Sequence, residues 1–485
     1  MTPSLPNFLL IVTDQQRADW TGYERPGVVD TPNLDALAAG GARFARAYCT
    51  APVCGPSRIS LATGNLARRS GAINNWSRMP LTASTYYQRL RALGYRVGFT
   101  GKIDLFRGGF SHQPIDDPLA RLHAAGFTDP RPIESAKTPD WSDAEIERQR
   151  ASGELGPYSR YLDGLGLLEA LCEHGHQWTS GAVEGELRQW MESGERWALW
   201  KDGIVPPAFY DDSVLPTEHC LDSFVGRSAV AMLEEYLARD TPWHLQVNFP
   251  SPHTPFHPPR EYGERYRTRR MPPAIVDDLA GKPGWQQRRF DGEGRTPAEE
   301  VARMRRQYSA TIELLDDWLG RFVALLRSHG RLDDTLIVFT SDHGEMLGDR
   351  GYFMKSCFYE QAVRVPLVMR GPHVTSGLVS DALVELHDVA PTFLELAGTA
   401  FADPVDAVSL APVLSGSRAR HRDSVVSEYY FGRMARDERW KFVFNDNDLP
   451  ELYDLEEDPD ELANVAEARP DVAMRFYRTL MERLG

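Results

Sequence analysis

The 485-residue sequence lacks the features that would direct it to a membrane or to a nucleic acid. It contains no run of about 18 or more apolar residues, and its start has no basic segment followed by a long apolar stretch, so we expect neither a membrane span nor a secretory signal. Acidic residues outnumber basic ones by 69 to 54, a net charge of -15, which disfavours nucleic acid and membrane lipid as partners. These absences predict a cytoplasmic protein.

Cysteine is also scarce, and its distribution argues against a disulfide framework. The five cysteines are odd in number and scattered, which fits reduced thiols: Cys49, Cys54, Cys172, Cys220 and Cys357. The sequence has no internal repeat or low-complexity tract. With 42% hydrophobic residues, the chain is long enough for one large domain with a sizeable core and a smaller second domain.

Three apolar runs are each followed at once by polar residues. The runs are residues 7–13, 243–249 and 335–340, and each is typical of a fully buried strand of a parallel sheet. Helical patterns occur at residues 33–40, 86–93, 228–237 and 299–326. This alternation predicts an α/β fold with a large, mostly parallel sheet sandwiched by helices. The polar residues after the strands should then meet at one edge of the sheet.

The pattern changes along the chain in two places. Residues 104–219 are rich in glycine, proline, tryptophan and charge with weak periodicity, and we interpret them as insertions near the site that shape substrate preference. After about residue 400, short strand patterns and a closing helix at 470–484 replace the longer elements. We therefore predict a catalytic α/β domain over residues 1–400 and a small α+β domain over residues 401–485.

The run Cys54-Gly-Pro-Ser-Arg58 places a cysteine and an arginine at the start of a predicted helix. A helix start offers unpaired backbone N–H groups and the positive end of the peptide dipoles, and Arg58 adds a planar charged group suited to a tetrahedral oxyanion. The run therefore predicts a place where an anion is held. The plain alternative is a buried thiol beside a surface arginine.

Acidic residues follow two of the predicted strands. Asp14 and Gln15 come after the first, and Asp342 and His343 come after the last. Carboxylate and amide oxygens suit a hard cation such as Ca²⁺ or Mg²⁺, while an imidazole is also acceptable to Mn²⁺ or Zn²⁺. An Asp-His pair alone is more often a helix cap than a ligand pair. Two such clusters at strand ends, together with Cys54, favour a metal site.

These motifs together resemble the type I sulfatases of the alkaline phosphatase superfamily from end to end of the chain. The matching segments are Asp14-Gln15, Thr31–Asp35, Cys54–Gly64, Gly101-Lys102, Pro252–Phe256, Ser341–Gly348, Lys355 with Phe358–Glu360, and Leu452–Pro459. The run from Ser341 to Pro366 is especially similar to choline-sulfatase-like members. The Asp-Gln and Asp-His pairs are also similar to those of the formylglycine-dependent phosphonate monoester hydrolases. The resemblance implies an alkaline-phosphatase-like fold.

The resemblance implies two cofactors. Cys54 would be oxidised after translation to formylglycine by a formylglycine-generating enzyme, and the aldehyde hydrate would be the nucleophile. A divalent cation, usually Ca²⁺ or Mn²⁺, would be held by Asp14, Gln15, Asp342, His343 and the modified Cys54. The metal would lower the pKa of one hydroxyl of the hydrate and polarise a sulfuryl oxygen.

The resemblance also implies the residues that bind substrate. Arg58 would hold the formylglycine hydrate, and Lys102, His253 and Lys355 would grip the sulfate oxygens. His253 or Lys355 would protonate the leaving alkoxide. Asn75 falls where the related hydrolases place a substrate-binding asparagine.

One position departs from the family pattern. Sulfatases commonly show Gly-Lys-x-His, in which the histidine takes a proton from the hydrate, but this chain has Asp104 two residues after Lys102. A carboxylate can serve as a base, and a nearby cation and Lys102 would keep it ionised. Asp104 is therefore either a substitute base or a side chain that points away from the site.

The sequence thus predicts a sulfuric ester hydrolase that acts on a small organic sulfate and releases inorganic sulfate and an alcohol. The alternative enzyme is a phosphonate monoester hydrolase or phosphodiester hydrolase that uses the same site. The alternative that is not an enzyme is an inert metal-binding protein with an unmodified Cys54. The natural ester, the metal and the oligomeric state, a homo-oligomer included, stay open.

Overall fold

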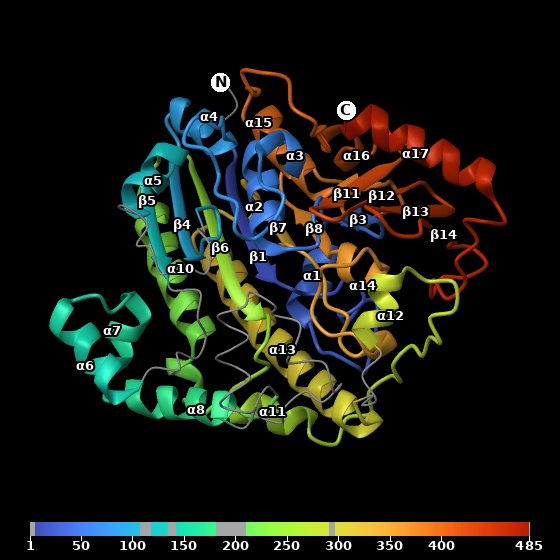
Figure 1. Ribbon diagram of the computed structural model, residues 1–485. Coiled ribbons are helices and arrows are strands. Elements are labelled where there is room, and N and C mark those ends of the chain that lie inside the picture. The colour runs from blue at the N-terminus through green and yellow to red at the C-terminus, as the bar shows by residue number, and fades with distance from the viewer. Residues whose placement is uncertain (1–4, 107–117, 134–141, 181–209, 291–295, 485) are drawn as a thin grey trace.

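The computed structural model describes residues 5–106, 118–133, 142–180, 210–290 and 296–484. Its centre is an eight-stranded sheet in the order β5-β4-β6-β1-β7-β8-β2-β9 (Figure 1). These strands are β5 Asp129–Ile133, β4 Arg96–Lys102, β6 Trp243–Pro252, β1 Asn7–Asp14, β7 Thr335–Ser341, β8 Leu367–Arg370, β2 Ala42–Phe44 and β9 Leu378–Ser380. Only β8 runs against the other strands of this sheet. The predicted mostly parallel sheet is therefore confirmed.

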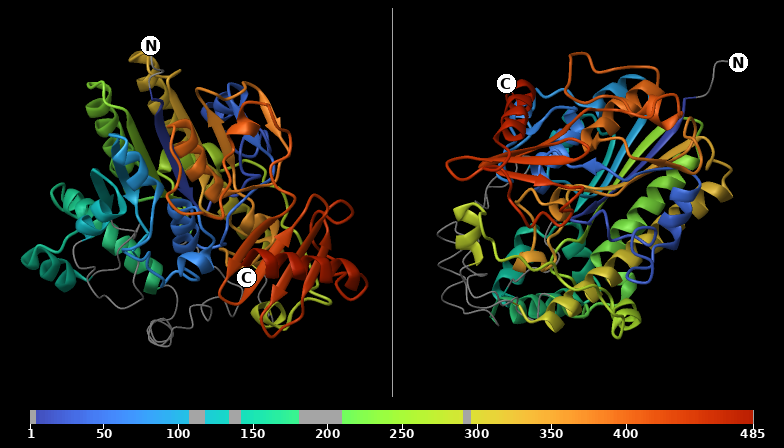
Figure 2. Two further views of the ribbon diagram at one scale, coloured as in Figure 1. Left: turned by 90° about the horizontal axis from the view of Figure 1, so that it is seen from above. Right: turned by 90° about the vertical axis from the view of Figure 1, so that its right-hand side faces the viewer.

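Alternate residues of the central strand β1 pack into two separate cores, because successive side chains of a strand point to opposite faces. Phe8, Leu10 and Val12 face one core, whereas Leu9 and Ile11 face the other. The first core is shared with α2 Cys54–Thr63, α4 Tyr86–Ala92 and α15 Val389–Leu396. The second is shared with α1 Pro32–Ala39, α10 Leu221–Leu237 and α13 Ala298–Ser328. The sheet is thus sandwiched by helices, as Figure 2 shows.

The segment from residue 104 to 219 contains both sheet and helix. Strand β5 lies within it and forms an edge of the central sheet beside β4. Its helices are α5 Pro118–Ala125, α6 Asp143–Ser152, α7 Pro157–Asp163 and α8 Leu168–Ser180, of which α6, α7 and α8 extend at the lower left of Figure 1. Part of this segment therefore belongs to the central sheet itself.

A second, four-stranded antiparallel sheet follows near the end of the chain. It consists of β11 Val425–Tyr429, β12 Gly432–Arg436, β13 Trp440–Asn445 and β14 Glu451–Asp454. Helix α17, Pro470–Leu484, packs on it through Phe476 and Leu480. This arrangement is the predicted α+β unit, while the boundary at residue 400 stays a prediction. The backbone N–H of Glu428 in β11 donates to the carbonyl of Thr50 at 2.9 Å, so the second sheet contacts the segment that leads to Cys54.

The remaining elements are short connections. The helices are α3 Ala67–Ser70, α11 Arg260–Tyr266, α12 Gly284–Phe290, α14 Glu360–Val363 and α16 Ala411–Leu414. The 3₁₀ turns are Thr217–His219, Asp349–Gly351 and Leu386–Asp388, and the small sheet pairs β3 Ala47–Tyr48 with β10 Val384–Glu385. Within the described ranges, no helix combines the length and the apolar character that crossing a bilayer would need.

Candidate active site

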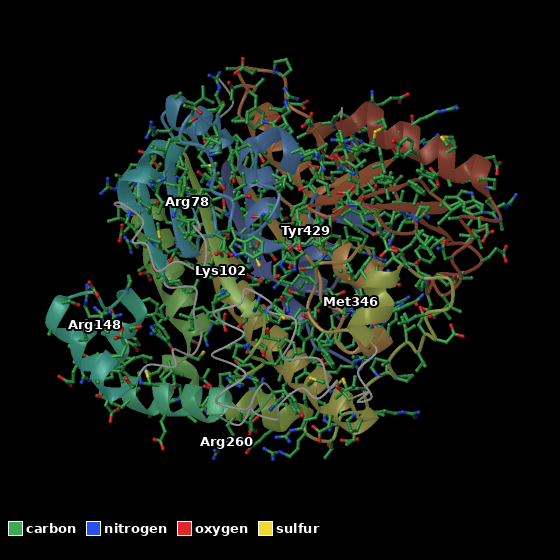
Figure 3. The ribbon with its side chains drawn as sticks, viewed as in Figure 1. Arg78, Lys102, Arg148, Arg260, Met346 and Tyr429 are labelled. Carbon is green, nitrogen blue, oxygen red and sulfur yellow. The ribbon has the colours of Figure 1, made fainter. Side chains whose placement is uncertain are left out.

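The predicted site residues come from separate elements that end at the same edge of the sheet. Asp14 is the last residue of β1, and Lys102, labelled in Figure 3, is the last residue of β4. Asp342 directly follows β7, and His253 directly follows β6. Cys54 is the first residue of α2. Carboxyl ends of parallel strands form the usual ligand-binding edge of an α/β sheet, so the topology itself assembles this cluster.

Four of these side chains offer potential metal ligands within a small volume. One ligand atom from each of Asp14, Cys54, Asp342 and His343 lies within 4.8 Å of all the others, and all four residues are buried. The Cys54 sulfur is 3.1 Å from His343 Nε2 and 3.7 Å from Asp14 Oδ1. His343 Nδ1 lies 2.9 Å from the carbonyl oxygen of Gly344, which can only accept a hydrogen bond. Nδ1 therefore carries a proton, and Nε2 is the ring nitrogen that faces the cluster.

Gln15, the predicted neutral oxygen donor, lies next to this cluster. Its backbone has a left-handed φ of 74°, uncommon for a residue with a side chain, and its N–H donates to Asp342 Oδ1 at 3.0 Å. Its Oε1 accepts a hydrogen bond from Lys355 Nζ. Two carboxylates, an amide oxygen and an imidazole nitrogen suit a hard divalent cation such as Ca²⁺ or Mn²⁺. The residues present therefore fit the metal that the sequence predicts.

The start of α2 is fastened to the strand ends through two side chains. Ser57 Oγ donates to the carbonyl of Asp342 at 2.6 Å. Arg58 is buried, and its guanidinium contacts Asp342 Oδ2 at 2.8 Å and Asp14 Oδ2 at 3.3 Å. Cys54 is consequently held against the two acidic residues, and the negative charge of the cluster is partly balanced.

Electrostatics favour the ionised forms of the acidic groups in this cluster. Burial alone would raise the pKa of Asp14, but the neighbouring positive charges, that of Lys102 first, hold this pKa well below its usual value. Burial and Asp14 likewise oppose ionisation of the Cys54 thiol, yet the neighbouring Lys102, together with Lys355 and His343, lowers its pKa. The site is therefore a compact arrangement of opposite charges that excludes much of the solvent.

Two further basic side chains lie beside each other at the same edge. Lys355 Nζ is 2.5 Å from Nε2 of His253, which is half-buried. His253 Nδ1 contacts the carbonyl of Thr254 at 2.8 Å, so Nδ1 carries the proton and Nε2 accepts from Lys355. Partial burial and the Lys355 ammonium hold the pKa of His253 well below its usual value. The imidazole is therefore neutral at physiological pH.

Asp104 points into the site and not toward solvent. Its carboxylate is buried and lies 3.1 Å from Lys102 Nζ, which also contacts Asp14. Its backbone adopts a left-handed φ of 41°. Of the two alternatives that the sequence left open for this side chain, the inward orientation is the one found.

Asn75 contacts the start of α2. Its Oδ1 accepts from the backbone N–H of Gly55 at 2.9 Å, in the first turn of α2, where the residue before the helix provides no side-chain cap. The Nδ2 group, which is the donor of this amide, is the group that could donate to a substrate oxygen.

Sequence reasoning gave no role to two buried residues that contact this cluster. Asn248 in β6 donates from Nδ2 to the carbonyl of Lys102 at 2.8 Å. Glu345 accepts a hydrogen bond from Gln15 Nε2. Glu345 belongs to the Ser341–Gly348 motif, and this motif could have indicated that Glu345 has a functional role. Asn248 lies inside a predicted strand, and nothing in that pattern indicates a role for it.

Comparison with protein families assigns the chain to one class. Residues 6–399 match the sulfatase family, and residues 348–484 match the C-terminal region of N-sulphoglucosamine sulphohydrolase. The chain therefore belongs to the sulfatase family, within the alkaline phosphatase superfamily.

Individual relatives agree with this assignment. The chain is 31% identical to a choline-sulfatase of Rhizobium meliloti (strain 1021), over 96% of this chain and 83% of that protein. It is 26% identical to an arylsulfatase of Clostridium perfringens (strain 13 / Type A), over 95% and 90%. Among solved structures, the phosphonate monoester hydrolase of Agrobacterium radiobacter superposes with a TM-score of 0.76 and 25% identity, over 99% of this chain and 95% of that one. The predicted family and fold are confirmed.

Proposed function

We propose that this protein hydrolyses a small organic sulfate ester to inorganic sulfate and an alcohol, with a formylglycine made from Cys54. The observation that carries the proposal is the place of Cys54, at the first residue of α2 and within 4.8 Å of ligand atoms from Asp14, Asp342 and His343. A nucleophile at this position would lie beside both a cation and the helix start that attracts an anion. The oxidation of Cys54 needs a formylglycine-generating enzyme as a partner.

The cation would be held by Asp14, Gln15, Asp342, His343 and residue 54. We propose Ca²⁺, with Mn²⁺ as the other cation that suits this donor set. When bound, it would supply Lewis-acid chemistry at the nucleophile and at a sulfuryl oxygen. The charge of Arg58 on Asp14 and Asp342 supports the site by keeping both carboxylates in place.

Lys102, His253 and Lys355 would bind the sulfate oxygens, and Arg58 would hold the formylglycine hydrate. Lys102 at the end of β4, Arg58 in α2 and the loop residue Lys355 are all buried, so they can oppose the charge of the equatorial oxygens in a site with little water. Lys355 is also our candidate for the proton donor to the leaving alkoxide, because its Nζ carries protons whereas His253 Nε2 presents a lone pair. His253 would then orient Lys355 and bind a sulfate oxygen only when Nε2 is protonated.

Asp104 would act as the base in the step that releases sulfate. Its buried carboxylate forms an ion pair with Lys102 at 3.1 Å, which supports the substitution of an aspartate for the usual histidine. Asn75 would bind substrate through Nδ2.

A panel of small sulfate, phosphate and phosphonate esters tests the proposed function. We expect the highest kcat/KM for a sulfate ester. Phosphonate monoester or phosphodiester hydrolysis is the second candidate, favoured by the similarity to the phosphonate monoester hydrolase of Agrobacterium radiobacter. A higher kcat/KM for those esters would replace the main proposal. The cytoplasmic location and a homo-oligomeric state stay predictions.

A further inference from the structure

Glu345 is a fully buried carboxylate that lies behind the proposed cation site. It comes two residues after His343, and Met346, the next residue, is labelled in Figure 3. One of its oxygens, Oε1, accepts from the backbone N–H of Leu347 at 2.9 Å and from that of Met354. The other, Oε2, accepts from the side chain of Gln15. Each of these partners is an N–H group, so the carboxylate serves here as an acceptor only.

The side-chain amide of Gln15 is held between an acceptor and a donor. On one side is the Glu345 carboxylate, and on the other is Lys355 Nζ, which can only donate. Only one orientation of the amide satisfies both neighbours, with Nε2 toward Glu345 and Oε1 toward Lys355. In the opposite orientation the amide N–H₂ would face an ammonium and leave the buried carboxylate without its donor, which is costly. Glu345 therefore determines that Gln15 turns its oxygen Oε1, and not its N–H₂ group, toward Lys355.

Glu345 also fixes the backbone that carries Lys355. The chain turns back between residues 346 and 354, where Met346 N–H donates to the carbonyl of Met354 at 2.7 Å. The bond from Met354 N–H to Glu345 closes this turn on its other side. Lys355 is the next residue, so one carboxylate holds both the Gln15 amide and the start of the lysine.

We propose that Glu345 is a positioning residue that makes Gln15 a cation ligand through Oε1, so that the affinity for the cation depends on a residue that does not touch it. The inference rests on the proposed cation site. In addition to that site, the buried negative charge of Glu345 determines which of its two orientations the Gln15 amide adopts. Outer partners of metal ligands commonly change metal affinity by about 10- to 100-fold when they are replaced.

The test is the substitution Glu345→Gln, with Mn²⁺ binding to the metal-free protein measured by titration calorimetry. The new amide keeps its oxygen for the N–H groups of Leu347 and Met354, so its N–H₂ faces Gln15. The amide of Gln15 must then turn over and present N–H₂ to the cation site. We expect the Kd for Mn²⁺ to rise by about 10- to 100-fold while the circular dichroism spectrum stays unchanged.

A matched control lies in the second sheet. Glu451 is also buried and also accepts from a glutamine, Gln286 Nε2 at 2.9 Å, and from Asn445 Nδ2 at 2.9 Å, but it belongs to β14. Glu451→Gln makes the same chemical change away from the site. It should leave the Kd for Mn²⁺ within about twofold of the wild-type value, given the usual independence of distant positions.

A reciprocal exchange gives a second test. In the variant Glu345→Gln with Gln15→Glu, the carboxylate at position 15 accepts from the amide at position 345 and has its other oxygen free for the cation. We expect this double variant to regain most of the Mn²⁺ affinity lost in Glu345→Gln. If Glu345→Gln does not fold, the double variant carries the test, because it restores the paired groups.

Two results would overturn the inference. One is a folded Glu345→Gln variant with the Mn²⁺ affinity of the wild type. The other is a folded double variant that binds Mn²⁺ no better than Glu345→Gln, or not at all where the single variant is unfolded. Failure of the proposed function is a separate result, namely a wild-type protein that neither binds Mn²⁺ nor cleaves a sulfate ester.

Discussion

Replacing Asp104 by asparagine should separate the two halves of the reaction. The carboxylate lies 3.1 Å from Lys102 Nζ in a buried position, and asparagine keeps its size while removing its capacity to take a proton. A positioned general base contributes about 10²- to 10⁴-fold to the step that it serves. Because we assign Asp104 to the release of sulfate, that step should slow by this factor while cleavage of the ester continues.

The assay is a rapid-mixing experiment with an ester whose alcohol absorbs light. In the wild type we expect alcohol and inorganic sulfate to appear together. In Asp104→Asn the alcohol should appear in a burst of about one equivalent per active site, followed by slow release of sulfate, the kinetic pattern of a slowed second step. Asp104→His should retain much of the rate and move its pH dependence toward a pKa of about 6.5.

A normal steady-state rate in Asp104→Asn without a burst would show that Asp104 is not the base. Asp104 would then only orient Lys102, and another group, such as His253, would have to take the proton. A proportional loss of both products would also contradict the assignment, because it would place Asp104 in the first step.

Three further predictions concern the nucleophile, the cation and the acid stability of the fold. Cys54→Ala should abolish turnover of the sulfate ester with an unchanged melting temperature, and measurable turnover in this variant would exclude the mechanism. Removal of the cation with a chelator should abolish activity, and added Ca²⁺ or Mn²⁺ should restore it. The Asp342→Ala variant should be inactive even with excess cation. Activity that survives chelation would contradict the metal site. Burial in β6 lowers the pKa of His244 to about 3, so the unfolded chain takes up a proton that the folded chain refuses, and the free energy of unfolding should fall as the pH drops from about 6.5 to about 3. His244→Gln should make urea unfolding less dependent on pH over this range, and an unchanged dependence would show that His244 is not responsible.

The central strands could be predicted from the sequence because their burial on both faces leaves an uninterrupted apolar run. Residues 7–13 and 335–340 form β1 and β7 with the expected polar residues at their ends. Strand β5 could not be predicted in this way, since Asp129–Ile133 contains two prolines. Proline lacks a backbone donor and is accepted at the edge of a sheet, where β5 lies.

Other elements depend on contacts that the local sequence does not contain. Strand β12, Gly432–Arg436, has no alternating pattern and is formed by pairing with β11 on one side and β13 on the other. Helix α10 begins at Leu221, ahead of the predicted start at residue 228. Asp222 and Ser223 in this added turn are buried, and Asp222 Oδ2 accepts from Ser251 Oγ at 2.5 Å, so a long-range contact extends the helix.

In the candidate site, too, some features could be predicted from the sequence and others depend on long-range contacts. Residue types and spacing predicted that Asp14, Asp342 and His343 lie together, because polar residues after parallel strands converge by topology. The orientation of Asp104 and the role of Glu345 depend on which neighbour each side chain meets. Lys102 and Gln15 are those neighbours, and only the folded arrangement reveals them.

The central claim is that residue 54 of the active protein is formylglycine, and its most direct test is the mass of the peptide that contains this residue. The protein should be produced together with a formylglycine-generating enzyme and assayed for sulfate release before digestion. We predict a peptide whose mass is lower than that of the cysteine form by the difference between H₂S and one oxygen atom. The fraction of the peptide in this form should increase with the specific activity of the preparation. A preparation that releases sulfate at full rate with only unmodified cysteine at position 54 would contradict the account.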